Sequence, residues 1–146
     1  MKKEQVIKQL IPGVIVGIVL GSVIGYLVGV DTEDVMKNHI GGLMGCLIPC
    51  LLNCVIIVKG TAKELDRKIS LGSAFVCALP QIIIGAVFGF LFHFVFLSMV
   101  LKLDTCTFSR IQMTILNMVL GVVVSTIMGY VVLRKYEKRV KYTRRN

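Results

Sequence analysis

Four long apolar runs, separated by short polar segments, dominate the pattern of residues along the chain. They cover about residues 10–30, 40–58, 71–101 and 111–133. A helix needs about 20 mostly apolar residues to cross the roughly 30 Å hydrocarbon core of a bilayer, so each run is long enough to cross once. None of them alternates between apolar and polar residues as barrel strands do. The pattern predicts an all-α protein, an integral membrane four-helix bundle, with residues 1–146 forming a single membrane domain.

The first run follows Lys2 and Lys3, as the apolar core of a signal peptide would. However, it is longer than the usual core of about 7–15 residues, and no site of the small-x-small type precedes Asp31. We therefore expect this segment to stay in the protein as its first span.

The basic residues predict how the bundle is oriented. Of seventeen Lys and Arg residues, fourteen lie in the N-terminal segment, in the connection 59–68 and in the tail 134–146, while Lys37, Lys102 and Arg110 occupy the other two connections. Short segments rich in Lys and Arg are retained in the cytoplasm, so both termini are predicted to be cytoplasmic. The expected location is a cell membrane, with the protein crossing several times and the plasma membrane of a prokaryote as the simplest case.

The basic C-terminal tail is expected to attract anionic lipid, because each Lys or Arg near such a surface contributes about 1 kcal/mol. Nucleic acid is not an expected partner, since these charges adjoin membrane helices. The predicted partner on this side is the anionic inner leaflet of the bilayer. The tail residues expected to contact lipid headgroups are Arg134, Lys135, Lys138, Arg139, Lys141, Arg144 and Arg145.

Glycine recurs at every fourth position through the first span. Small residues at that spacing share one side of a helix and let a second backbone come close. The step of four exceeds the 3.6-residue turn, so the line winds around the helix, which favours a right-handed crossing or two different neighbours. This glycine zipper can pack the span inside its own bundle or join copies into an oligomer, and both alternatives stay open. The packing candidates are Gly13, Gly17, Gly21, Gly25 and Gly29, with Gly121 and Gly129 in the fourth span.

Two internal similarities raise the question of duplication. Residues 12–21 match residues 80–89 at five of ten positions, which fits duplication of a two-helix hairpin. Residues 17–28 also resemble residues 121–132, yet these two spans run in opposite directions. One hairpin duplication cannot produce both, so at least one similarity reflects composition alone.

Asp, Glu, Lys and Arg are missing from the apolar runs. Proton- and ion-coupled transporters generally keep such a group within the membrane, so the sequence argues against that class. The neutral candidates are Asn53, Gln81 and His93. Polar side chains of this kind usually bridge helices in a membrane through hydrogen bonds worth about 0.6 kcal/mol each. The alternative is that these three residues line a polar path. His93 follows Ala74 by nineteen residues, which predicts a place near the outer headgroups, in contact with water.

Cys46, Cys50 and Cys54 form a stripe along the second span, and Cys77 of the third span is expected at a depth similar to that of Cys54. Free cysteine packs as a small apolar residue, which is the expected role. Thiols in a row could also pass a soft cation such as Cu(I). The spacing differs from the CxxC patterns of zinc and redox sites, so no metal site is assigned.

The connections of about nine to twelve residues are too short to build a catalytic domain, and they contain no nucleophile–base pair. We therefore expect no enzyme and no cofactor. The favoured hypothesis is a small non-catalytic membrane protein that acts through helix association, with itself or another membrane protein, as an accessory subunit, assembly factor or scaffold. The alternative is a small oligomeric channel or permease for a small solute or soft metal ion, with Asn53, Gln81 and the thiol stripe along its path. A membrane thiol oxidoreductase is a third and weaker hypothesis.

Overall fold

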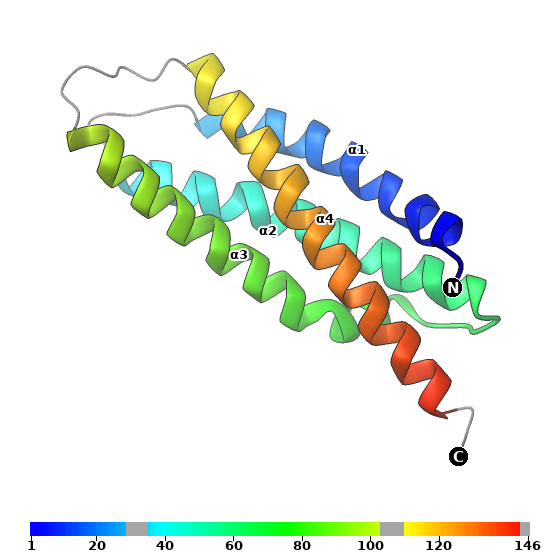
Figure 1. The fold of residues 1–146 in the computed structure, drawn as a ribbon. Helices are drawn as coiled ribbons and strands as arrows, with labels where there is room; N and C mark the ends of the chain where they lie inside the picture. The colour runs from blue at the N-terminus through cyan, green and yellow to red at the C-terminus, as the bar shows by residue number, and fades with distance from the viewer. Residues whose placement is uncertain (29–34, 103–109, 144–146) are drawn as a thin grey trace.

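The computed structural model describes residues 1–28, 35–102 and 110–143, which form four α-helices (Figure 1). They are α1 (Lys3–Val28), α2 (Val35–Glu64), α3 (Leu71–Lys102) and α4 (Arg110–Thr143). Each helix is long and apolar enough to cross a membrane. The predicted all-α class with several membrane spans is therefore confirmed. Three predicted functional residues, Gly29, Arg144 and Arg145, lie outside the described residues.

Three of the helices continue past the apolar runs. Helix α1 already begins at Lys3, α2 continues to Glu64, and α4 continues to Thr143, through most of the basic tail. Hydropathy indicates which part of a helix is apolar enough to lie in lipid, and it does not indicate where the helix begins or ends. Lys, Arg and Glu are themselves good helix formers, so the backbone remains helical beyond the apolar part. At about 1.5 Å per residue, the 34 residues of α4 reach about 51 Å, well beyond the thickness of a hydrocarbon core.

Helices α2 and α4 form the central contact of the bundle. Helix α1 packs against both of them, while α3 packs mainly on α2 and touches α4 less. Within the described part of the chain α1 and α3 do not meet. They therefore flank the α2–α4 pair on opposite sides, as Figure 1 shows.

A short connection of six residues joins α2 to α3. Helix α2 ends in a Schellman motif: Asp66 has a φ of 52°, the Arg67 N–H donates to the Ala62 carbonyl at 2.9 Å, and the Asp66 N–H donates to the Lys63 carbonyl at 3.1 Å. Helix α3 begins after Ser70, whose Oγ accepts a hydrogen bond from a backbone N–H three residues later at 3.1 Å. The chain is therefore reversed sharply, which keeps the basic residues of the connection close to the end of α2.

One end of the bundle carries the N-terminus, the α2–α3 connection and the last turns of α4 (Figure 1). We call it the basic end, because twelve of the seventeen Lys and Arg residues of the sequence belong to these described segments. The end of α1, the start of α2, the end of α3 and the start of α4 lie at the opposite end (Figure 1). The chain therefore returns its basic segments to one place, as the predicted orientation requires.

Two apolar clusters fill the interior. The cluster nearer the basic end joins residues of all four helices, and the other joins α2 to α4. Cysteines of α2 belong to both, so the thiols are part of the packed core. The first cluster contains Val6, Cys54, Ile57, Val58, Ala74, Ala78, Ile82, Val132 and Leu133; the second contains Cys46, Cys50, Leu120 and Val124.

Candidate functional site

The glycines of α1 face other helices of the same chain. A Cβ added at Gly13 would collide with the Asn53 side chain of α2. One added at Gly17 would lie 2.9 Å from the Cα of Val122, and one at Gly21 would lie 2.8 Å from the Cα of Met118, both on α4. The line therefore meets two different neighbours, which is one of the two alternatives that its winding favours. These three glycines pack α1 within its own bundle.

Asn53 connects three helices. Its Nδ2 donates a hydrogen bond to the Ser125 carbonyl of α4 at 2.7 Å. Its side chain occupies the space opposite Gly13 of α1 and Gly129 of α4, where an added Cβ would strike it. The Oδ1 atom is buried and has no hydrogen-bond partner among the described residues. Asn53 thus acts as an interhelical bridge with one acceptor left over.

His93 lies inside the bundle, and the prediction of a water-exposed histidine was wrong. Its side chain is only 1% exposed, and its Nε2 lies 3.0 Å from the Oδ1 of Asn117 on α4. Gly42 of α2 lies against the imidazole ring, where a Cβ would collide with it. In the sequence, phenylalanine recurs at every second position from Phe88 to Phe96, a pattern typical of side chains that face lipid on all sides of a helix. In fact, the missing side chain at Gly42 makes a space on α2 that the ring fills.

The residues predicted to line a polar path, Asn53, Gln81 and His93, have different surroundings in the structure. The α4 partners of Asn53 and His93, Ser125 and Asn117, are eight positions apart, which is about 12 Å along the helix. Gln81 precedes His93 by twelve positions on α3, which is about 18 Å. Gln81 is buried, and its Oε1 has no hydrogen-bond partner in the described part of the chain. His93 therefore lies about 12–18 Å along the bundle from Asn53 and Gln81. Asn53 and Gln81 lie at nearly the same depth, because Cys46 and Cys50 of α2 lie opposite Gly89 and Gly85 of α3.

The thiol stripe fits against glycines of α3. Cys46 lies opposite Gly89 and Cys50 lies opposite Gly85, with an added Cβ 2.5 Å and 2.6 Å from the respective sulfur atoms. Cys54, one turn further, belongs to the apolar cluster near the basic end. Among the residues that the structure describes, no three His, Cys, Asp or Glu side chains are grouped closely enough to hold a metal ion. The geometry favours packing as the role of the stripe.

A network of charges surrounds Glu137, beyond the apolar part of α4. Its carboxylate bonds to the Met1 ammonium group, to Lys141 Nζ at 2.9 Å and to Arg134 at 3.2 Å. The Met1 ammonium, followed by Lys141 and Arg134, lowers the pKa of Glu137 to about 2. This network ties the start of α1 to the last turns of α4.

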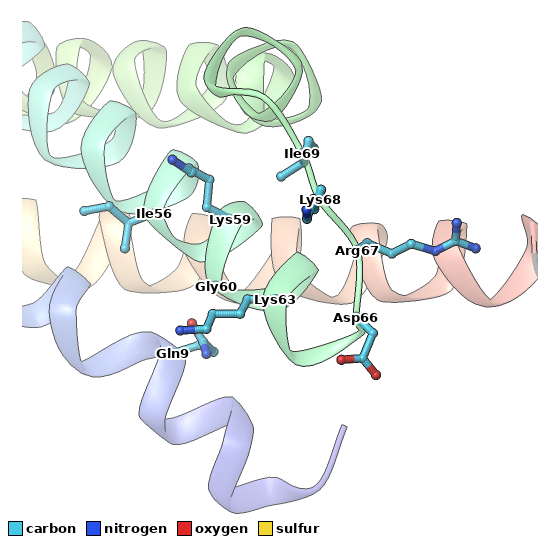
Figure 2. Close-up of a pocket in the computed structure, with 9 residues that line it drawn as sticks. All are labelled: Gln9, Ile56, Lys59, Gly60, Lys63, Asp66, Arg67, Lys68 and Ile69. Atoms are coloured by element: carbon cyan, nitrogen blue, oxygen red, sulfur yellow. The ribbon is translucent and has the colours of Figure 1, made fainter.

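A basic hollow of about 950 Å³ opens at the basic end (Figure 2). Its lining comes from the last turns of α2, from the α2–α3 connection and from Gln9 of α1. Lys59, Lys63, Arg67 and Lys68 oppose a single acid, Asp66. None of these four basic side chains has an ion pair with another described residue. The hollow therefore combines unpaired positive charge with apolar walls at Ile56 and Ile69.

An apolar groove of about 580 Å³ lies next to this hollow, between α2 and the start of α3. The two share Ile56 and Lys59 as lining residues. At Gly72 a Cβ would meet nothing within 4 Å, so the missing side chain leaves the groove open. The other lining residues of the groove are Leu51, Leu52, Val55, Leu71 and Phe75.

The predicted headgroup residues of the tail differ in their surroundings. Arg134 and Lys141 are engaged by Glu137, while Arg139 lines a second hollow of about 280 Å³ together with Arg67 and Lys68. Lys135 and Lys138 are exposed. Cys77 is half-buried and accepts an N–H···S contact from Arg139 at 3.9 Å.

Sequence reasoning missed the basic hollow and the partners of the intramembrane polar groups. The pair Gly85 and Gly89 repeats the four-residue spacing of the thiols, and the antiparallel order of the two spans could have suggested that they meet. Nothing in the sequence pairs His93 with Asn117, because that contact depends on how α3 and α4 are rotated.

Comparison of the chain with protein-family models, with characterised proteins and with solved structures finds no match. Its function is therefore argued from the geometry above.

Proposed function

We propose that this chain is a non-catalytic multi-pass membrane protein that works through helix association in the bilayer, as an accessory subunit, assembly factor or scaffold. Its partner is a membrane helix of another protein or of a second copy. The proposal depends on how the chain divides its residues between the interior and the outer faces of the bundle.

The observation that carries the proposal is a row of exposed apolar side chains, nearly all β-branched, along α1 and another along α4. On α1 the row recurs at every fourth position with each member at least 50% exposed, and the α4 row has the same spacing with members 42–70% exposed. Ile83, Val87, Leu91 and Val95 form a comparably exposed row on α3, in which leucine interrupts the β-branched residues. β-Branched side chains have little χ1 freedom to lose, and helices in lipid associate through such van der Waals contact. The α1 row is Ile7, Ile11, Ile15, Val19, Val23 and Leu27; the α4 row is Ile111, Ile115, Val119, Val123, Ile127 and Val131.

The interior supports the same proposal. Asn53 donates a hydrogen bond to the backbone of α4, and His93 is hydrogen-bonded to Asn117. The thiols of Cys46 and Cys50 fill the space left by glycines of α3. These groups are used in packing the chain on itself. Contact with another membrane component is then left to the outer faces and to the basic end.

Photocrosslinking in cells tests the proposal. A photoreactive amino acid replaces Ile15 in the α1 row or Val123 in the α4 row, and Phe88 of α3, which lies outside all three rows, serves as the equally exposed control position. We expect a discrete adduct from the α1 or α4 row and none from Phe88. A differently tagged second copy shows whether the adduct is with the chain itself. The absence of a discrete adduct from both rows would contradict the proposal.

A flux assay on the purified protein in liposomes tests the channel alternative. We expect K⁺, Cu(I) and glycerol to cross at the rate of protein-free vesicles. Flux that is present in the wild type and lost in Asn53→Leu or Gln81→Leu would overturn the proposal in favour of a channel or permease.

A further inference from the structure

We propose that the basic end holds a discrete site for one anionic phospholipid. Its phosphate lies among Lys59, Lys63 and Lys68 in the basic hollow, and one of its acyl chains lies in the apolar groove between α2 and α3. This site is distinct from the rows that carry the proposed function. It is also distinct from a general attraction of the tail to a charged surface.

The headgroup part of the site follows from charge and from the absence of competing partners. Lys59 and Lys63 lie one turn apart on α2, and Lys68 reaches the same hollow from the connection (Figure 2). Arg67 lies at the rim and extends away from Lys59 and Lys63 in this view. The ammonium groups of Lys59, Lys63 and Lys68 have no ion pairs with described residues, whereas Arg134 and Lys141 are already bound to Glu137. These three exposed lysines are therefore available to bind an anion.

The acyl-chain part follows from the groove. Its walls are aliphatic or aromatic apart from Lys59, and its volume of about 580 Å³ falls within the usual range of small-molecule sites. From Lys59 to Leu51 the groove extends eight residues along α2, which is about 12 Å. The open space at Gly72 gives an extended chain access beside α3.

The position of the two parts along α2 selects a lipid over a free anion. Val58 is the last residue of the apolar run, so Lys59 and Lys63 lie where headgroups lie, and Leu51, Leu52 and Val55 lie in the hydrocarbon. Lys59 lines both spaces. A lysine at the edge of the hydrocarbon can turn its ammonium group toward the headgroups while its stem stays beside apolar walls. A free phosphate would fill only the hollow, whereas a phospholipid fills both.

The test measures lipid binding to the full chain in a neutral detergent by native mass spectrometry. The probes are dioleoyl phosphatidylglycerol, dioleoyl phosphatidylcholine, glycerol phosphate without acyl chains, and inorganic phosphate. We expect one phosphatidylglycerol to bind at least about tenfold more tightly than phosphatidylcholine, and the two water-soluble phosphates to bind far more weakly. Equal affinity for the two lipids would overturn the proposal, and so would phosphate binding as tightly as the lipid, since it would indicate a free-anion site.

Two sets of variants separate the headgroup from the chain. The test variant combines Lys59→Gln, Lys63→Gln and Lys68→Gln, and we expect its affinity for phosphatidylglycerol to fall about tenfold or more. The control variant combines Lys2→Gln, Lys3→Gln and Lys8→Gln, which removes the same charge at exposed positions of the same end. We expect the affinity of the control to stay within about twofold of the wild type. An equal loss in both triple variants would show diffuse attraction and overturn the site.

Gly72→Leu tests the acyl chain. Its Cβ would meet nothing within 4 Å, so we expect the thermal unfolding of the protein to change little. Affinity for phosphatidylglycerol should fall about tenfold. Unchanged affinity would show that the groove holds no chain. Photocrosslinking tests the apolar rows of α1 and α4, whereas lipid binding tests the basic hollow and the groove. A failure of this site can therefore be distinguished from a failure of the proposed function.

Discussion

Replacing Gly21 with alanine adds one methyl group at the tightest approach of α1 to α4. The new Cβ would lie 2.8 Å from the Met118 Cα and 2.9 Å from the Asn117 carbonyl oxygen. Ordinary contacts begin at about 3.4 Å, so the two helices must separate by about 0.6 Å. Both obstacles are backbone atoms, which cannot turn aside as a flexible side chain would.

The size of the effect follows from that separation. A gap of about 0.5–1 Å already loses a quarter to a half of the van der Waals attraction of the atoms beside it, and overpacking of this kind costs about 1–3 kcal/mol. Alanine is a better helix former than glycine by about 0.5–1 kcal/mol, which opposes the loss. We therefore expect Gly21→Ala to lower the free energy of unfolding by about 1–2 kcal/mol.

Gly72→Ala is the matched control. It makes the same chemical change in another helix, at a position where a Cβ meets nothing within 4 Å. Only the helix preference of alanine remains, so the free energy of unfolding should stay the same or rise by up to about 1 kcal/mol.

The assay is reversible unfolding in mixed micelles with increasing sodium dodecyl sulfate, followed by circular dichroism, with the oligomeric state measured in parallel. The reasoning is refuted if the two alanine variants are equally stable. It is also refuted if Gly21→Ala dissociates an oligomer and leaves the unfolding of the monomer unchanged, because the glycines would then face another copy.

Three further outcomes are expected. Glu137→Gln should lower the free energy of unfolding at pH 7 by about 1–2 kcal/mol, less than the pKa shift alone suggests because water screens the exposed Lys141 and Arg134. The folded-state pKa of Glu137 is about 2 against an ordinary 4.5, so this stability is present above pH 4.5 and is lost as the pH falls toward 2. Across that range the difference in free energy of unfolding between the wild type and the variant should therefore shrink toward zero. Gly85→Ala should destabilise the chain, and adding Cys50→Ala should restore most of the loss in the same unfolding assay, because the added methyl occupies the place of the removed sulfur; no recovery would argue against packing. A double-mutant cycle of His93→Phe and Asn117→Leu should give a coupling of about 1 kcal/mol, and zero coupling would contradict their 3.0 Å contact.

Several features could be predicted from the sequence because they depend on local composition. The four spans follow from apolar length, and the return of the basic segments to one end follows from their order along the chain. The winding of the glycine line favours a right-handed crossing or two neighbours for α1, and Gly13 and Gly21 do meet different helices. These properties need only the helical period and the thickness of a bilayer.

Other features depend on how the helices are rotated about their axes, which composition does not determine. His93 was misplaced because five phenylalanines at alternate positions indicate lipid on every side, whereas the space at Gly42 on another helix admits the ring. The basic hollow was missed for a similar reason. Lys59 and Lys68 are nine residues apart, and only the left-handed turn at Asp66 brings the connection back beside α2.

The interior polar groups share one arrangement, in which a side chain on one helix fills the place of a missing side chain on the next. Asn53 meets Gly13 in this way, and His93 meets Gly42. In lipid the hydrophobic effect does not drive helices together, so a close fit and a few interhelical hydrogen bonds must hold them. The use of Asn53 and His93 in holding the bundle together supports the proposal that contact with other membrane components falls to the apolar rows and the basic end. The exposed residues of those surfaces can be changed without touching the interior, so each proposal can be tested in a folded protein.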